Sequence, residues 1–117
     1  MPKKFMRSFR FAHAGARHTL RTQRNIWIHL SIGIAALLAA VWLQVSLVET
    51  AILVLTISFV LVAEMINTAI EEVVNLAKPE THPQAALAKN IGAAAVLVAA
   101  IGSVIIGILI FAPRMVW

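Results

Sequence analysis

The chain has 117 residues, of which 61% are hydrophobic and only 13% are charged, with a formal net charge of +5. Soluble domains have about 45–50% apolar and about 25% charged residues, and a soluble chain this short would need far more polar surface. These proportions argue against a soluble enzyme, a disordered chain and a nucleic-acid-binding module. They predict one integral membrane domain over residues 1–117. Cysteine is absent, so disulfides, thiolate metal sites and a cysteine nucleophile are excluded.

Residues 1–25 hold seven of the ten basic residues and no acidic one. On a helix, with about 100° per residue, five of these basic side chains fall near one line, and Phe and Ala side chains cover much of the remaining surface. This pattern is typical of an amphipathic helix that lies on a membrane surface. Anionic membrane lipids are its expected partner. A mitochondrial targeting helix has a similar composition and is the alternative interpretation.

Three apolar stretches follow, at about 26–48, 51–77 and 85–111. Each is longer than the ~20 residues that a helix needs to cross the hydrocarbon core. The first connector, 45–50, is short, and the second, 78–83, is polar and contains two prolines that break a helix. We therefore expect an all-α integral membrane fold with a surface helix and three transmembrane helices.

Lysine and arginine are distributed unevenly between the two ends of these spans. The N-terminal segment has seven, the second connector with its flank has Lys78 and Lys89, the first connector has none, and the C-terminal tail has Arg114. Basic residues concentrate on the cytoplasmic side of a membrane. This asymmetry predicts a cytoplasmic N-terminus.

A polar stripe crosses the second span. Taking Glu64 as the origin, Asn67, Glu71 and Asn75 lie at about −60°, −20° and +20° on an ideal helix, and Glu72 stands off the stripe at about +80°. Glu64 lies about two turns inside the membrane, where a charged side chain costs at least ~2.5–3.5 kcal/mol and indicates a functional site. Proton-relay transporters and catalytic carboxylates both use such residues, and the stripe alone favours neither.

The surroundings favour chemistry on phosphate. Glu64 and Glu71 lie about 10 Å apart along the helix axis. The deeper carboxylate suits a general base, and the shallower one suits a divalent-cation ligand. His82, Lys89 and the basic helix lie near the second connector and suit a phosphate-bearing ligand.

Several runs resemble the prokaryotic diacylglycerol kinase family. They are residues 64–71 (EMINTAIE), 79–83 (PETHP) and 88–89 (AK), while 8–15 and 24–29 (RNIWIH) look like the undecaprenol-kinase-type branch. The resemblance implies a homotrimeric membrane lipid kinase of the bacterial cytoplasmic (inner) membrane. Its substrates would be ATP, with Mg²⁺, and a lipid alcohol.

The resemblance also assigns roles to residues. It implies that Glu64 is the general base, that Asn67 is an essential active-site asparagine and that Glu71 binds Mg²⁺. Phosphoryl transfer needs this kind of alignment of nucleophile, metal and cations. The positions matched to cofactor binding are Lys4, Phe11, Gln23, Glu71, Glu80, Thr81, His82, Lys89 and Asn90.

Three amides stand where the family usually has carboxylates. Gln23 replaces the second metal-binding glutamate, and Asn75 and Asn90 replace aspartates. An amide oxygen can ligate Mg²⁺ but supplies no charge, so we expect weaker metal binding. We favour an active kinase, with a weakened or inactive membrane scaffold and a small proton-coupled transporter as alternatives.

The identity of the lipid alcohol stays open, and some residues are assigned structural roles only. The sequence does not decide between diacylglycerol and undecaprenol, although the branch resemblance favours the polyprenol. We assign His13, His18 and His29 to interfacial or packing roles. We assign the small residues of the third span, including Gly92, to close helix packing.

Overall fold

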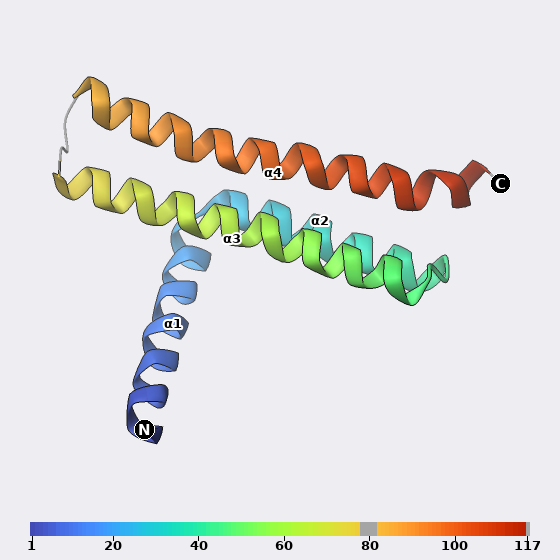
Figure 1. Cartoon of the computed structure of the whole chain (residues 1–117), viewed down its shortest axis with the longest axis horizontal. Coiled ribbons are helices and arrows are strands. Elements are labelled where there is room, and N and C mark those ends of the chain that lie inside the picture. The colour runs from blue at the N-terminus through green and yellow to red at the C-terminus, as the bar shows by residue number, and fades with distance from the viewer. Residues whose placement is uncertain (78–81, 117) are drawn as a thin grey trace.

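The computed structural model describes residues 1–77 and 82–116. In these residues it is entirely helical apart from the short connections: α1 (Pro2–Thr22), α2 (Arg24–Trp42), α3 (Leu47–Ala77) and α4 (Pro83–Val116) (Figure 1). The helices α2, α3 and α4 are long and apolar enough to cross a membrane. The predicted all-α membrane fold, with an N-terminal helix and three candidate spans, is confirmed.

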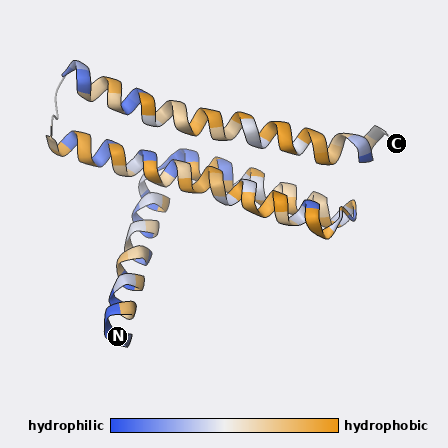
Figure 2. Cartoon of the chain, viewed as in Figure 1, coloured by the Kyte–Doolittle hydropathy of each residue, from blue (hydrophilic) through white to orange (hydrophobic). Residues whose placement is uncertain are grey.

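The helix α3 is central, because it packs against both α2 and α4. The helix α1 leaves this bundle at a steep angle, with its N-terminal end away from the other three helices (Figure 1). Hydrophobic residues dominate α2, α3 and α4, whereas α1 alternates between hydrophilic and hydrophobic residues (Figure 2). This arrangement suits a helix that lies along a membrane surface beside three that cross it.

The joint between α1 and α2 is a single extended residue. Gln23 has φ −110° and ψ 111°, which interrupts the helix. The Gln23 backbone N–H still donates to the Thr19 carbonyl at 2.9 Å, and Trp27 Nε1 donates to the Leu20 carbonyl at 2.6 Å. Together these bonds connect the end of α1 to the first turn of α2 and set the angle between them.

The helix α2 ends at Trp42, within the apolar run that extends to residue 48. Gln44 adopts the left-handed conformation, with φ 55°. Its N–H donates to the Val41 carbonyl, and the Val45 N–H donates to the Ala40 carbonyl. This pair of bonds is a Schellman motif, which ends a helix and reverses the chain. Backbone hydrogen bonding therefore ends the helix where hydropathy alone gives no signal.

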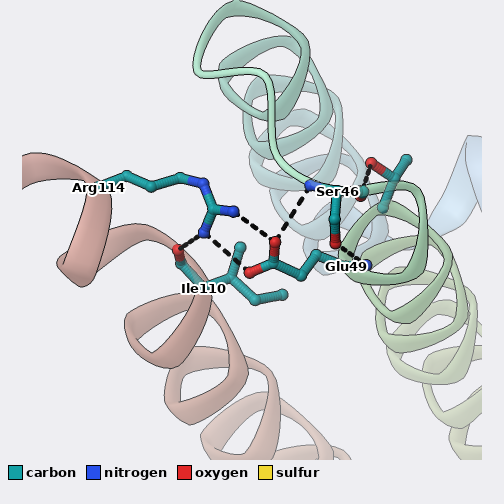
Figure 3. A network of polar contacts seen from close by, with 5 residues as sticks. Ser46, Glu49, Ile110 and Arg114 are labelled. Carbon is teal, nitrogen blue, oxygen red and sulfur yellow. Dashed lines mark hydrogen bonds and ion pairs between the residues drawn. The ribbon is translucent and has the colours of Figure 1, made fainter.

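The start of α3 is capped and joined to α4. The Glu49 N–H donates to Ser46 Oγ, and the Ser46 N–H donates to Glu49 Oε1, both at 3.1 Å, which forms a capping box. Arg114 of α4 donates to both Glu49 oxygens, at 2.9 and 2.5 Å, and to the Ile110 carbonyl (Figure 3). This Glu49–Arg114 pair fastens α3 to α4 at the end of the bundle near the α2–α3 turn.

Two packing features hold the bundle together. Ala40, Leu53 and Ile110 are buried against one another between α2, α3 and α4. Gly33 allows α2 to approach α3 closely, because a Cβ there would lie 2.8 Å from Ile57 Cγ2. Most other large apolar side chains are exposed, as expected for surfaces that face lipid or other membrane helices.

Candidate active site

Glu64 is the most deeply buried charged residue that the structure describes, and it faces α2. Only 3% of its surface is exposed. Its Oε1 lies 3.0 Å from Nε2 of His29, yet the contact lacks hydrogen-bond geometry, so Oε1 has no hydrogen-bond partner among the described residues. A buried carboxylate oxygen without a hydrogen bond is costly. Its retention is a mark of function rather than of stability.

Thr68 does not satisfy this oxygen, although it lies on the next turn. Its hydroxyl donates to the Glu64 carbonyl at 2.9 Å, a bond within the helix that leaves the carboxylate untouched. Thr68 is itself buried. The Glu64 Oε1 thus keeps acceptor capacity that no described residue uses.

Asn67 points from α3 towards α4 and is bonded to Glu71. Its Nδ2 donates to Glu71 Oε1 at 3.2 Å. Because an ionised carboxylate can only accept hydrogen bonds, the amide nitrogen must be the donor. Its Oδ1 is buried with no partner among the described residues. A Cβ on Gly92 of α4 would lie 2.3 Å from this oxygen. Gly92 therefore provides the space in which the Asn67 amide sits.

The predicted metal ligands, Glu71 and Gln23, do not form a closed cage. Glu71 is half-buried on α3, and Gln23 is half-buried at the α1–α2 joint. No cluster of three or more His or acidic side chains that could hold a metal occurs in residues 1–77 and 82–116. One carboxylate and one amide do fit Mg²⁺ that arrives with ATP, because Mg²⁺ commonly uses one or two carboxylates plus substrate phosphates.

The end of α1 lies beside this part of α3. His18 Nε2 is 3.8 Å from Glu72 Oε1, and both side chains are exposed. Such an exposed pair contributes little stability. It does show that the last turns of α1 reach α3 next to Glu71.

The remaining predicted residues are distributed as follows. His82 caps α4, because its Nδ1 accepts the Gln84 N–H at 3.2 Å. Lys89 is half-buried and Asn90 exposed near the start of α4. Lys4 and Phe11 are exposed on α1, which extends away from the bundle (Figure 1). Glu80 and Thr81 lie outside the described residues.

One chain therefore brings Glu64, Asn67 and Glu71 together and leaves Lys4 apart from them. Sequence reasoning missed two residues of this site, His29 and Gly92. Our assignment of His29 to an interfacial or packing role overlooked its contact with Glu64. The available signal was that His29 is the only ionisable residue between Arg24 and Glu49.

These features define an integral membrane protein with an acidic site on one of its candidate spans and a basic N-terminal helix beside it. Residues 10–111 match the family described as prokaryotic diacylglycerol kinase. The chain belongs to this family.

Three relatives illustrate the similarity. A diacylglycerol kinase of Synechocystis is 44% identical over 101 residues, which are 86% of this chain and 58% of that protein. An undecaprenol kinase of Bacillus subtilis is 39% identical over 112 residues, 96% of this chain and 91% of that protein. A diacylglycerol kinase of Escherichia coli is 36% identical over 97 residues, 77% of this chain and 80% of that protein.

The chain thus spans little more than half the length of the Synechocystis relative and most of the other two. The names of these relatives confirm the expected family of lipid kinases and its undecaprenol-kinase-like branch.

Proposed function

We propose that the chain is a membrane lipid kinase that transfers the γ-phosphate of ATP to the hydroxyl of a lipid alcohol. The observation that carries this proposal is the buried Glu64 carboxylate with an oxygen free to accept, one turn from the Asn67–Glu71 hydrogen bond. The family membership supplies the reaction class. The reaction takes place at the cytoplasmic face of the bacterial inner membrane, where the basic residues of α1 gather.

Glu64 acts as the general base. Its free Oε1 accepts the proton of the lipid hydroxyl as the hydroxyl oxygen bonds to the γ-phosphorus and the bond to the ADP oxygen breaks. A positioned base of this kind contributes typically ~10²–10⁴ in rate. Asn67 fixes the orientation of Glu71 through its amide N–H, and Gly92 leaves room for that amide.

Glu71 and Gln23 would hold Mg²⁺, with Lys89, His82 and the basic face of α1 near the phosphates. The ion, when bound, neutralises charge on the phosphate oxygens. Gln23 contributes an amide oxygen and no charge, so Glu71 carries most of the attraction for the cation. Affinity for free Mg²⁺ is low as a result, and the ATP phosphates bring the ion in.

Undecaprenol is the lipid alcohol that we favour, with diacylglycerol as the alternative. The undecaprenol kinase of Bacillus subtilis aligns with 96% of this chain and over 91% of its own length. The Synechocystis diacylglycerol kinase is more identical, at 44%, but its alignment with this chain covers only 58% of its own length.

A homotrimer completes the site. One chain exposes large apolar side chains on all three candidate spans and holds Lys4 away from Glu71. Neighbouring copies in the membrane would cover these faces and supply an α1 to each site. Native mass spectrometry or cross-linking that finds only monomers in mild detergent would contradict this assembly.

The test is phosphoryl transfer by the purified protein in micelles with radiolabelled ATP, Mg²⁺ and either lipid. Label in the lipid fraction for the parent protein, and a rate ~10²–10⁴-fold lower for Glu64→Gln, supports the kinase. A faster rate on undecaprenol identifies the preferred acceptor. A folded parent protein that labels neither lipid supports the scaffold alternative. The amides Gln23, Asn75 and Asn90, which replace carboxylates of the family, would then explain the loss of activity. Proton flux across liposomes that contain the purified protein would favour the transporter alternative.

A further inference from the structure

The buried carboxylate of Glu64 has one ionisable neighbour. His29 Nε2 lies 3.0 Å from Glu64 Oε1, and the two side chains are 24% and 4% exposed. The helix α2 has no other ionisable side chain beyond Arg24. Among the described residues, no other cationic group lies within 4.0 Å of Glu64.

Three polar side chains in this region are hydrogen-bonded within their own helices. Thr68 donates to the Glu64 carbonyl. Thr56 and Ser103, which line the same pocket as His29, donate to the carbonyls of Ile52 and Ala100. Among the described residues, the contact found for the Glu64 carboxylate is the one with the imidazole of His29.

His29 also lies at the edge of a pocket. The pocket has a volume of about 260 Å³ and lies between α2, α3 and α4. Its other lining residues are mostly apolar, among them Gly33, Ile57, Val60 and Val104. Glu64 itself does not line this pocket, so His29 is the residue that touches both the pocket and the carboxylate.

From this geometry we propose that His29 is a positioning residue for Glu64. The imidazole restricts the orientation of the carboxylate, while the missing hydrogen bond leaves Oε1 able to accept from the lipid hydroxyl. The proton goes to Glu64, and His29 contacts neither the lipid oxygen nor the phosphate. This inference rests on the proposed lipid-kinase function and adds a residue to its site.

The kinetic test compares His29→Leu, which removes the polar contact, with His29→Gln, which keeps a polar side chain beside the carboxylate. We expect His29→Leu to lower kcat by ~10²-fold, the cost of misplacing a reacting group by about 1 Å, with little change in KM for ATP. His29→Gln should recover much of this loss. His13→Gln, on the exposed surface of α1, is the matched control and should leave both constants unchanged.

A double variant shows whether His29 acts through Glu64. If it does, adding His29→Leu to Glu64→Gln changes the residual rate no further, because residues that act as a unit are not additive. Equal losses from His29→Leu in both backgrounds would overturn the proposal. An unchanged kcat in His29→Leu would overturn it as well.

A second measurement needs no turnover. In ¹⁵N-histidine-labelled protein, Glu64→Gln should shift the imidazole signals of His29 and leave those of His13 in place. This readout separates the two proposals: absent lipid phosphorylation contradicts the kinase, whereas an unshifted His29 signal contradicts the His29–Glu64 contact. It also stands if His29→Leu fails to fold.

Discussion

Gly92→Ala is the substitution that tests the site most directly, because it adds one methyl group at a known distance from Asn67. The new Cβ would lie 2.3 Å from Asn67 Oδ1, whereas ordinary contacts begin at 3.4 Å. The amide therefore has to move by about 1 Å, the difference between these two distances. We expect this movement to lengthen the 3.2 Å hydrogen bond from Nδ2 to Glu71.

The expected effects on activity and stability differ. Misplacing a catalytic group by about 1 Å costs ~10²-fold in rate. Overpacking costs ~1–3 kcal/mol of stability, but Ala is better than Gly inside a helix by ~1 kcal/mol, so the net loss of stability is ~0–2 kcal/mol. We expect kcat to fall ~10²-fold while the protein stays folded in detergent, with at most a modest decrease in the midpoint of thermal unfolding.

The matched control is Gly102→Ala on the same helix, where a Cβ meets nothing within 4 Å. Gly102→Ala has the same gain in helix propensity as Gly92→Ala, but its methyl group does not contact Asn67. Activity should therefore be unchanged, and thermal stability should be equal or higher. The assay is lipid phosphorylation with radiolabelled ATP, alongside thermal unfolding. Full activity in Gly92→Ala, or equal losses in both variants, would refute the reasoning.

Three further predictions concern the acidic residues. Glu64→Gln should lower phosphoryl transfer by ~10²–10⁴-fold while nucleotide binding, measured by calorimetry, persists; near-full activity would remove Glu64 from its role. Gln23→Glu should lower the Mg²⁺ concentration that gives half the maximal rate, and Glu71→Gln should lower the rate severely. A Mg²⁺ titration in which Gln23→Glu changes nothing and Glu71→Gln is tolerated would contradict the metal assignment. Glu49→Gln and Arg114→Gln, combined in a double-mutant cycle of thermal unfolding, should give a small favourable coupling, because the pair is bidentate but partly exposed. The value of kcat should not change, and a zero coupling would mean that the pair does not join α3 to α4.

The fold was predictable because each helix is specified by its own sequence. Long apolar runs separated by polar breaks indicate spans, and the basic amphipathic pattern indicates α1. The Asn67–Glu71 hydrogen bond follows from the same local geometry, since residues four apart are neighbours on a helix.

Contacts between helices were not predictable in this way. The pairing of His29 with Glu64 and the space that Gly92 leaves for Asn67 depend on the register of α3 against α2 and α4. The register cannot be read from the sequence, because the exposed and the buried faces of a membrane helix carry the same types of apolar residue. Hydropathy did not predict where α2 ends for a related reason. Gln44 ends the helix through its backbone conformation inside an apolar run.

That left-handed Gln44 has a practical consequence for protein production. An L-residue in this conformation costs roughly 1–2 kcal/mol that glycine does not, partly offset by the greater freedom of glycine in the unfolded chain, ~0.4–1 kcal/mol. Gln44→Gly would therefore keep the Schellman turn and relieve its strain at the end of the bundle remote from Glu64. The turn is a position at which the protein can be made more robust for purification and crystallisation while its chemistry is left alone.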